Sequence, residues 1–119
     1  MGYPPQGGGG GGAVLKVLKS SSVTANGTEQ TIFDQTLTKP TNISGWINVY
    51  PLDTNDILYV REYITFGSEE RLHAVEEYRD AQSTNQCFFE KRIVQGRYRV
   101  TIEQPVTVMR TFKYEFYEG

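Results

Sequence analysis

The sequence predicts an all-β domain of the antiparallel β-sandwich or jelly-roll-like type, with about eight strands. Apolar and polar residues alternate through most of the chain, which is the period of a strand with one buried face. Turn-forming residues interrupt this alternation about every ten residues. Aromatic residues make up 13% of the chain, and tyrosine and phenylalanine are enriched in strands. A closed β-barrel is the alternative architecture.

Eight segments carry the strand pattern, and polar or glycine-containing turns separate them. Asn26-Gly27 predicts a tight hairpin between the first two strands, and Gln95-Gly96 predicts a turn between the sixth and seventh. The segment 71–82 fits either helical or strand spacing, and a strand is preferred because it follows a strong strand. The predicted strands are 14–23, 28–37, 43–50, 57–66, 71–82, 87–94, 97–104 and 106–117.

The chain is divided into a short arm and one domain. With 119 residues it can form a single hydrophobic core, which we place in residues 13–119. Residues 1–12 include six consecutive glycines and are expected to be a flexible arm, because glycine loses the most backbone entropy on ordering. We expect this arm to become ordered against a neighbouring subunit, with Tyr3, Pro4 and Pro5 as its contact residues.

Charge and cysteine content argue against several classes of partner. The formal net charge of −2 and the scattered basic residues do not fit nucleic-acid binding. The N-terminus has no signal-peptide pattern, and no apolar run is long enough to cross a membrane. The single cysteine, Cys87, excludes an intrachain disulfide and lies in an apolar stretch, where it is expected to be a small buried side chain.

No catalytic or cofactor-binding arrangement is recognised, and we predict that the protein is not an enzyme. The one histidine, His73, has no nearby nucleophile and orienting acid in sequence, and it is expected on the surface. Glu69-Glu70 and Glu76-Glu77 are adjacent pairs, and adjacent residues of a strand point to opposite faces. Neither pair can therefore act together on one substrate.

The loop at 51–56 contains the candidate metal ligands. Asp53, Asn55 and Asp56 offer oxygen atoms of the kind that calcium prefers, but the other ligands of a known calcium loop are missing. The same residue types also build turns by bonding to their own backbone, and we prefer this second interpretation. No metal and no cofactor are predicted.

Four aromatic residues are candidates for a sugar-stacking surface: Trp46, Tyr50, Tyr59 and Tyr63. Packing in the core of the domain is the preferred alternative, because every strand of a sandwich buries one face. Trp46 and Tyr50 lie on the strand face opposite Ile43 and Ile47. We therefore predict Trp46 and Tyr50 as interface residues, together with Tyr3, Pro4 and Pro5 of the arm.

Parts of the chain resemble small β-sandwich virion proteins of tailed phages and archaeal viruses. The resemblance is carried by TANGTEQTIF at 24–33, GWINV at 45–49, ILYVREY at 57–63 and RTFKYEF at 110–116. The sequence departs from that pattern at Asn55-Asp56, where the family often has Gly-Asp. The resemblance implies a capsid-decoration or related assembly role in the virion, after synthesis in the host cytoplasm.

The partners that this resemblance implies are other copies of the chain and a capsid protein. Two alternative functions remain: a carbohydrate- or receptor-binding module, and a subunit of an extracellular fibre or matrix.

Overall fold

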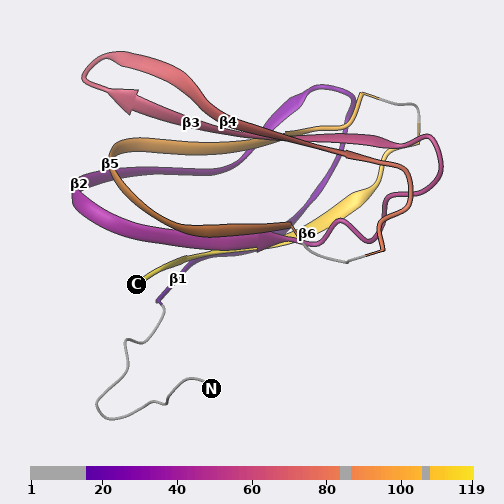
Figure 1. Ribbon diagram of the computed structural model, residues 1–119, viewed down its shortest axis with the longest axis horizontal. Coiled ribbons are helices and arrows are strands. Elements are labelled where there is room, and N and C mark those ends of the chain that lie inside the picture. Colours follow the sequence, from indigo (N-terminus) through magenta and orange to yellow (C-terminus); the bar gives the residue numbers. More distant parts are fainter. Residues whose placement is uncertain (1–15, 84–86, 106–107) are drawn as a thin grey trace, which may run out of the picture.

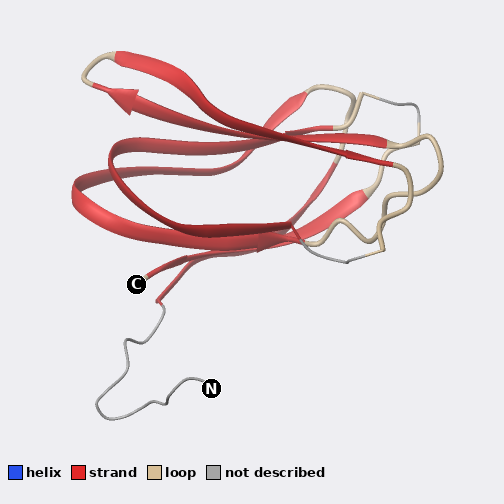
Figure 2. Ribbon diagram, viewed as in Figure 1, coloured by secondary structure: helices blue, strands red, loops and turns tan. Residues whose placement is uncertain are grey.

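The computed structural model describes residues 16–83, 87–105 and 108–119, and describes only the backbone of 87–94. These residues form one antiparallel sheet of six strands, and they contain no helix, so none of them crosses a membrane as a helix (Figure 2). The strands are β1 (Lys16–Thr24), β2 (Glu29–Ile47), β3 (Ile57–Phe66), β4 (Glu69–Arg79), β5 (Cys87–Glu103) and β6 (Thr111–Glu118). Their order in the sheet is β1-β6-β2-β5-β3-β4. The predicted all-β class is confirmed.

The long strands β2 and β5 pair with each other along nearly their whole length, from Glu29 opposite Glu103 to Ile47 opposite Cys87. Midway, both strands bend together, and the sheet folds over itself into two facing layers (Figure 1). One layer holds β3, β4 and the halves of β2 and β5 that pair beside them. The other layer holds β1, β6 and the remaining halves.

The bend has a local cause in the sequence of both strands. Between the pairs Leu37–Gly96 and Thr41–Val94, β2 has three residues where β5 has one, which forms a bulge. Pro40 lies in this bulge, where its missing N–H costs no ladder hydrogen bond. Gly96 has a φ of 92°, which side-chain-bearing residues rarely adopt.

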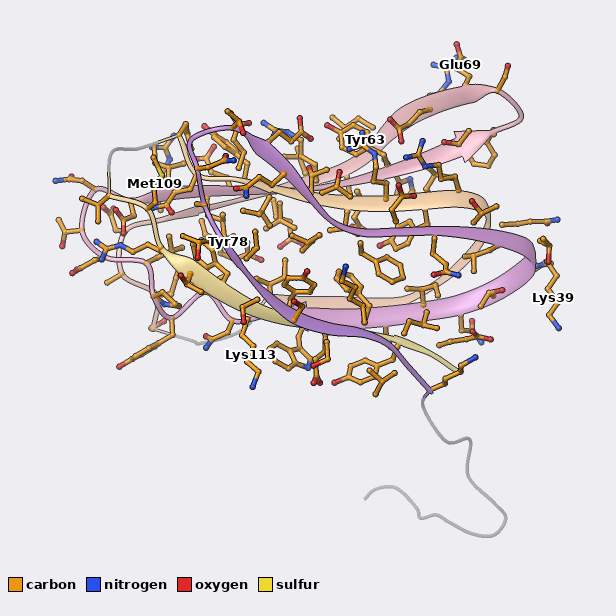
Figure 3. All side chains as sticks on the ribbon, turned by 180° about the vertical axis from the view of Figure 1, so that it is seen from behind. Lys39, Tyr63, Glu69, Tyr78, Met109 and Lys113 are labelled. Carbon is orange, nitrogen blue, oxygen red and sulfur yellow. The ribbon has the colours of Figure 1, made fainter. Side chains whose placement is uncertain are left out.

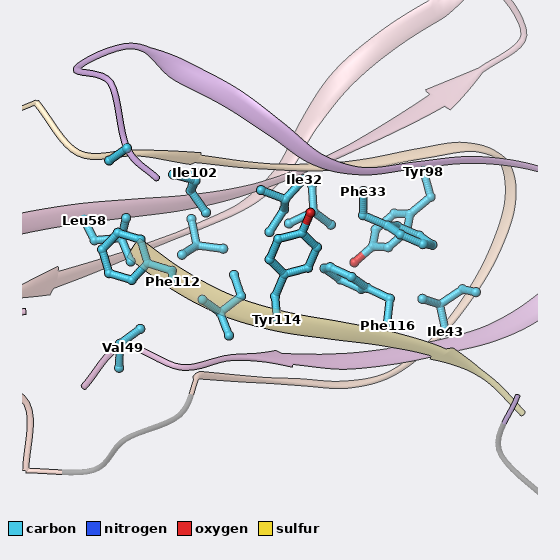
Figure 4. Packing of buried hydrophobic residues seen from close by; sticks show 14 of the residues in the cluster. Ile32, Phe33, Ile43, Val49, Leu58, Tyr98, Ile102, Phe112, Tyr114 and Phe116 are labelled. Atoms are coloured by element: carbon cyan, nitrogen blue, oxygen red, sulfur yellow. The ribbon is translucent and has the colours of Figure 1, made fainter. Parts of the chain in front are cut away.

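The hydrophobic core lies between the two layers (Figure 4). Phe116 of β6 stacks on Phe33 of β2 with ring centroids 4.4 Å apart. Tyr98 of β5 meets Phe33 edge-on at 6.0 Å, and its hydroxyl donates a hydrogen bond to the buried carboxylate of Glu62. Aromatic side chains from both layers therefore fill the centre of the molecule.

The predicted number of eight strands is wrong, because two pairs of predicted strands are each one strand. The predicted strands 28–37 and 43–50 both lie mostly within the single strand β2. The predicted strands 87–94 and 97–104 both lie mostly within the single strand β5. Proline and glycine, such as Pro40 and Gly96, commonly mark the ends of strands. In the structure they lie beside the same bend, so both strands continue through it.

The predicted hairpin at Asn26-Gly27 is also wrong. β1 pairs with β6 and not with β2, and the turn carries the chain from one layer to the other (Figure 1). Gly27 does have a positive φ of 85°, as the prediction required. The side-chain oxygen of Asn26 accepts hydrogen bonds from the N–H and hydroxyl of Thr28, which stabilises the turn locally.

Two further predictions concern the later strands. The ambiguous segment 71–82 is a strand up to Arg79, where β4 ends, and residues 80–82 lie in the loop after it. The last strand begins at Thr111, so Val108 lies in the preceding loop, 54% exposed, and not in the core with Phe112.

Candidate interaction surfaces

The predicted interface residues fall into two groups. Tyr3, Pro4 and Pro5, with the rest of the 1–12 arm, lie outside the described residues. Trp46 lies near the end of β2 and Tyr50 in the loop after it. Both point away from the core, because Ile47 and Val49 between them are buried. Tyr50 is 68% exposed, whereas Trp46 is half-buried.

Trp46 is held in place by a chain of polar contacts on the outer face of its layer. Its indole N–H donates to the hydroxyl of Tyr117 at 2.9 Å, and that hydroxyl donates to the carboxylate of Glu115. Ser20 of β1 donates to the same carboxylate at 2.7 Å. The hydrogen bonds from Tyr117 and Ser20 lower the pKa of Glu115, and the bond to Glu115 raises the pKa of Tyr117.

The four aromatic candidates do not form one sugar-stacking surface, and they do not line the core together. Tyr59 and Tyr63 lie on the outer face of β3, which belongs to the other layer from Trp46. Figure 3 shows Tyr63 on one outer side of the molecule and Lys113 of β6 on the other. The fold of the sheet at the β2–β5 bend separates the two pairs.

Arginine side chains cover the tyrosine rings of β3. The guanidinium carbon of Arg99 lies 4.4 Å from the ring centre of Tyr63, and that of Arg61 lies 5.1 Å from the ring centre of Tyr59. Arg99 also donates to Glu70 through Nε and Nη2, at 3.0 and 2.8 Å. One guanidinium group therefore lies over each ring, in the position that a stacking sugar would need.

Glu29 joins three strands on this outer face. Its Oε2 accepts hydrogen bonds from Tyr63 at 2.5 Å and Thr101 at 2.6 Å, and Arg61 lies 3.9 Å away. Burial raises the pKa of Glu29, but the two hydrogen bonds and the nearby arginines outweigh it, so the pKa is lowered. Burial and the bond to Glu29 raise the pKa of Tyr63.

Replacing Glu29 with glutamine should reduce stability near neutral pH and matter less in acid. A carboxylate whose pKa is lowered on folding stabilises the fold above its unfolded pKa, and this contribution is lost as the pH falls through the folded value. Glu29 is partly exposed, so we expect a loss of about 0.2–1 kcal/mol near pH 7. Urea unfolding of both proteins near pH 7 and near pH 3 measures it. An equal deficit at both pH values would contradict the prediction.

The candidate calcium ligands form a turn that an arginine closes. Oδ2 of the buried Asp56 accepts hydrogen bonds from the backbone N–H of Asp53 and from Nε of Arg110, both at 2.8 Å. The backbone N–H of Asn55 donates to Asp80 at 2.6 Å. No three His, Cys, Asp or Glu side chains in the described part of the chain are grouped as a metal site requires. Sequence reasoning missed Arg110 and Asp80, which are distant in the chain and carry no local signal.

The acidic pairs of β4 are split between its two faces. Glu70 bonds to Arg99 on the outer face, whereas Glu69 bonds to Arg71 on the other face at 2.5 Å. This confirms that such a pair cannot act together. His73 is exposed at an irregular position of β4. Cys87 opens β5, but its side chain lies outside the described part.

The β3–β4 hairpin carries three exposed apolar side chains. Phe66 is 67% exposed beside the turn, and Leu72 and Val75 of β4 are 53% and 52% exposed. β4 is the last strand of the sheet and pairs only with β3, so its outer edge has no partner strand among the described residues. A groove of about 570 Å³ lies between the hairpin tip and the β2–β5 bend, and Leu37, Pro40, Thr65, Phe66, Gly67, Gln95 and Gly96 line it.

No known family model, curated protein or solved structure matches this chain.

Proposed function

We propose that the chain is a non-enzymatic structural subunit of a virus particle, a capsid decoration or related assembly protein, that acts by self-association. The main support comes from the β3–β4 hairpin. Its side chains Phe66, Leu72 and Val75 are each more than half exposed at an open sheet edge. Apolar side chains gathered beside an unpaired strand edge favour contact with another protein. The resemblance to virion β-sandwich proteins supports the choice of a particle surface.

In this proposal the folded-over sheet acts as a rigid, sandwich-like body. The aromatic core between the layers and the paired charges of the outer face support this rigidity. The arm at residues 1–12 reaches a neighbouring subunit or the capsid, with Tyr3, Pro4 and Pro5 in contact. Trp46 and Tyr50 provide a second contact area on the opposite layer from Tyr63.

Two measurements on the full chain test this function. Light scattering after size-exclusion chromatography should show oligomers whose mass rises with concentration, and a monomer at every concentration would contradict self-association.

Mass spectrometry of density-purified particles from producing cells should detect the chain, and antibodies against it should label the particle exterior. Particles that lack the chain would contradict the virion role.

The carbohydrate-binding alternative predicts a different result. A glycan-array signal that Trp46→Ala abolishes without unfolding the protein would replace the proposed function with that one. The comparison variant is Tyr63→Phe, which keeps a ring in the other layer and should leave such a signal unchanged.

A further inference from the structure

The unpaired edge of β4 has an irregular step that reverses its faces. Glu62 lies opposite Ala74, but the next residue of β3, Tyr63, lies opposite Leu72, so His73 is an extra residue in β4. Before this step Leu72 is on the outer face with Tyr63. After it, Val75 is on the outer face with Arg61. Leu72 and Val75, although three residues apart, therefore lie on the same face.

The charged residues beside them follow the same reversal. Arg71 lies opposite the inward-facing Ile64, and Glu76 lies opposite the inward-facing Val60. Arg71 and Glu76 thus share the inner face of β4, as Leu72 and Val75 share the outer face. Arg71 and Glu76 carry opposite charges, and Leu72 and Val75 are both apolar. The members of each pair can therefore make a favourable contact with each other across two strands.

We infer that β4 pairs antiparallel with β4 of a second copy, with Leu72 opposite Val75 of that copy and Arg71 opposite its Glu76. Residues directly opposite in an antiparallel pair lie on the same face, and this register satisfies that condition for both contacts. A two-fold axis repeats each contact, so one dimer contains two Leu–Val contacts and two Arg–Glu contacts. This inference rests on the proposed self-association and names the surface that carries it.

Neighbouring registers lose both contacts. A shift of two residues in one direction places Leu72 opposite Glu77 and Arg71 opposite Tyr78, and in the other direction Leu72 opposite His73 and Arg71 opposite Ala74. The inferred register also places Glu70 opposite Glu77. Both of these carboxylates already have an arginine of their own, Arg99 for Glu70 and Arg79 for Glu77. The Leu–Val and Arg–Glu contacts therefore form together only in the inferred register.

A charge swap on the full chain tests the Arg–Glu contact. Arg71→Glu and Glu76→Arg, each alone, should weaken the dimer about tenfold or more, because two ion pairs per dimer become two like-charge contacts. The double variant restores the pairing in reverse and should recover most of the affinity, which sedimentation equilibrium measures. Circular dichroism and thermal unfolding establish that each variant folds, as expected because Arg71 and Glu76 are both exposed.

Disulfide crosslinking tests the register itself. In a Cys87→Ser background, Leu72→Cys mixed with Val75→Cys should crosslink under mild oxidation, because directly opposite residues have Cβ atoms about 4.5–5.5 Å apart. Either variant alone should crosslink poorly, since equivalent residues are about 10 Å apart along the strand in this register. Val17→Cys on β1, 55% exposed at the opposite edge of the sheet, is the matched control and should not crosslink.

The outcomes separate this inference from the proposed function. An oligomer that ignores the charge swap and crosslinks through Val17→Cys would overturn the β4 contact and leave self-association standing. A chain that stays monomeric at every concentration would overturn both. Rescue in the double variant together with crosslinking only in the mixture supports the contact and its register.

Discussion

Replacing Gly96 with alanine should destabilise the protein by about 2–5 kcal/mol. Two independent costs add at this position. The φ of 92° strains any side-chain-bearing residue, and an added Cβ would lie only 2.6 Å from the carbonyl oxygen of Thr65 in β3. Because that obstacle is backbone, relief requires β3 to move away from the bend. Urea unfolding measures the change in free energy.

Gly67→Ala is the matched control for this prediction. Gly67 also has a positive φ, of 63°, but an added Cβ there would meet nothing within 4 Å. Only the backbone cost applies, so we expect a loss of about 1–2 kcal/mol. Equal losses at Gly96 and Gly67 would show that the close approach of β3 at the bend contributes nothing.

Replacing Phe116 with alanine should cost about 3–5 kcal/mol, because it removes a large side chain from the centre of the core. Phe116 is fully buried, stacks on Phe33 at 4.4 Å and meets Tyr114 edge-on at 6.0 Å. The stacking on Phe33 joins the two layers, so the cavity would lie between them. Chemical denaturation and the loss of near-ultraviolet circular dichroism would report the effect.

Phe66→Ala removes the same atoms from an exposed position and is the control. Phe66 is 67% exposed at the hairpin turn, so its replacement should change stability by no more than about 0.5 kcal/mol. A loss at Phe66 comparable to that at Phe116 would contradict the assignment of the core to the space between the layers.

Sequence alone predicted the class of the fold, and the apolar–polar alternation of the sequence matches the burial of the strands where one face meets the core. The alternation in β3 is a clear case: Leu58, Val60 and Ile64 are buried, while Tyr59 and Arg61 face outward. Glu62 breaks the pattern, since it is a buried carboxylate that accepts a hydrogen bond from Tyr98. The alternation of apolar and polar residues indicates which face of a strand is buried wherever only one face contacts the core.

The pairing of strands could not be predicted in the same way. Gly96, Pro40 and Asn26-Gly27 are strong local signals for interrupted strands and tight turns. Whether a chain reverses there, bends or crosses to another layer depends on contacts with distant strands, such as β6 beside β1. For the same reason the sequence could not show that Arg110 closes the Asp53–Asp56 turn or that Trp46 and Tyr63 lie in different layers.

The shared bend of β2 and β5 has a consequence for how the molecule opens. Since the same two strands run through both layers, neither layer can separate as an independent unit without breaking the ladder that continues into the other. We therefore expect backbone amides of β2 on the two sides of Pro40 to exchange with solvent deuterium through one common opening event. The fold would then melt as a single cooperative body, and a partner that rigidifies the β3–β4 hairpin would slow exchange in the distant layer as well.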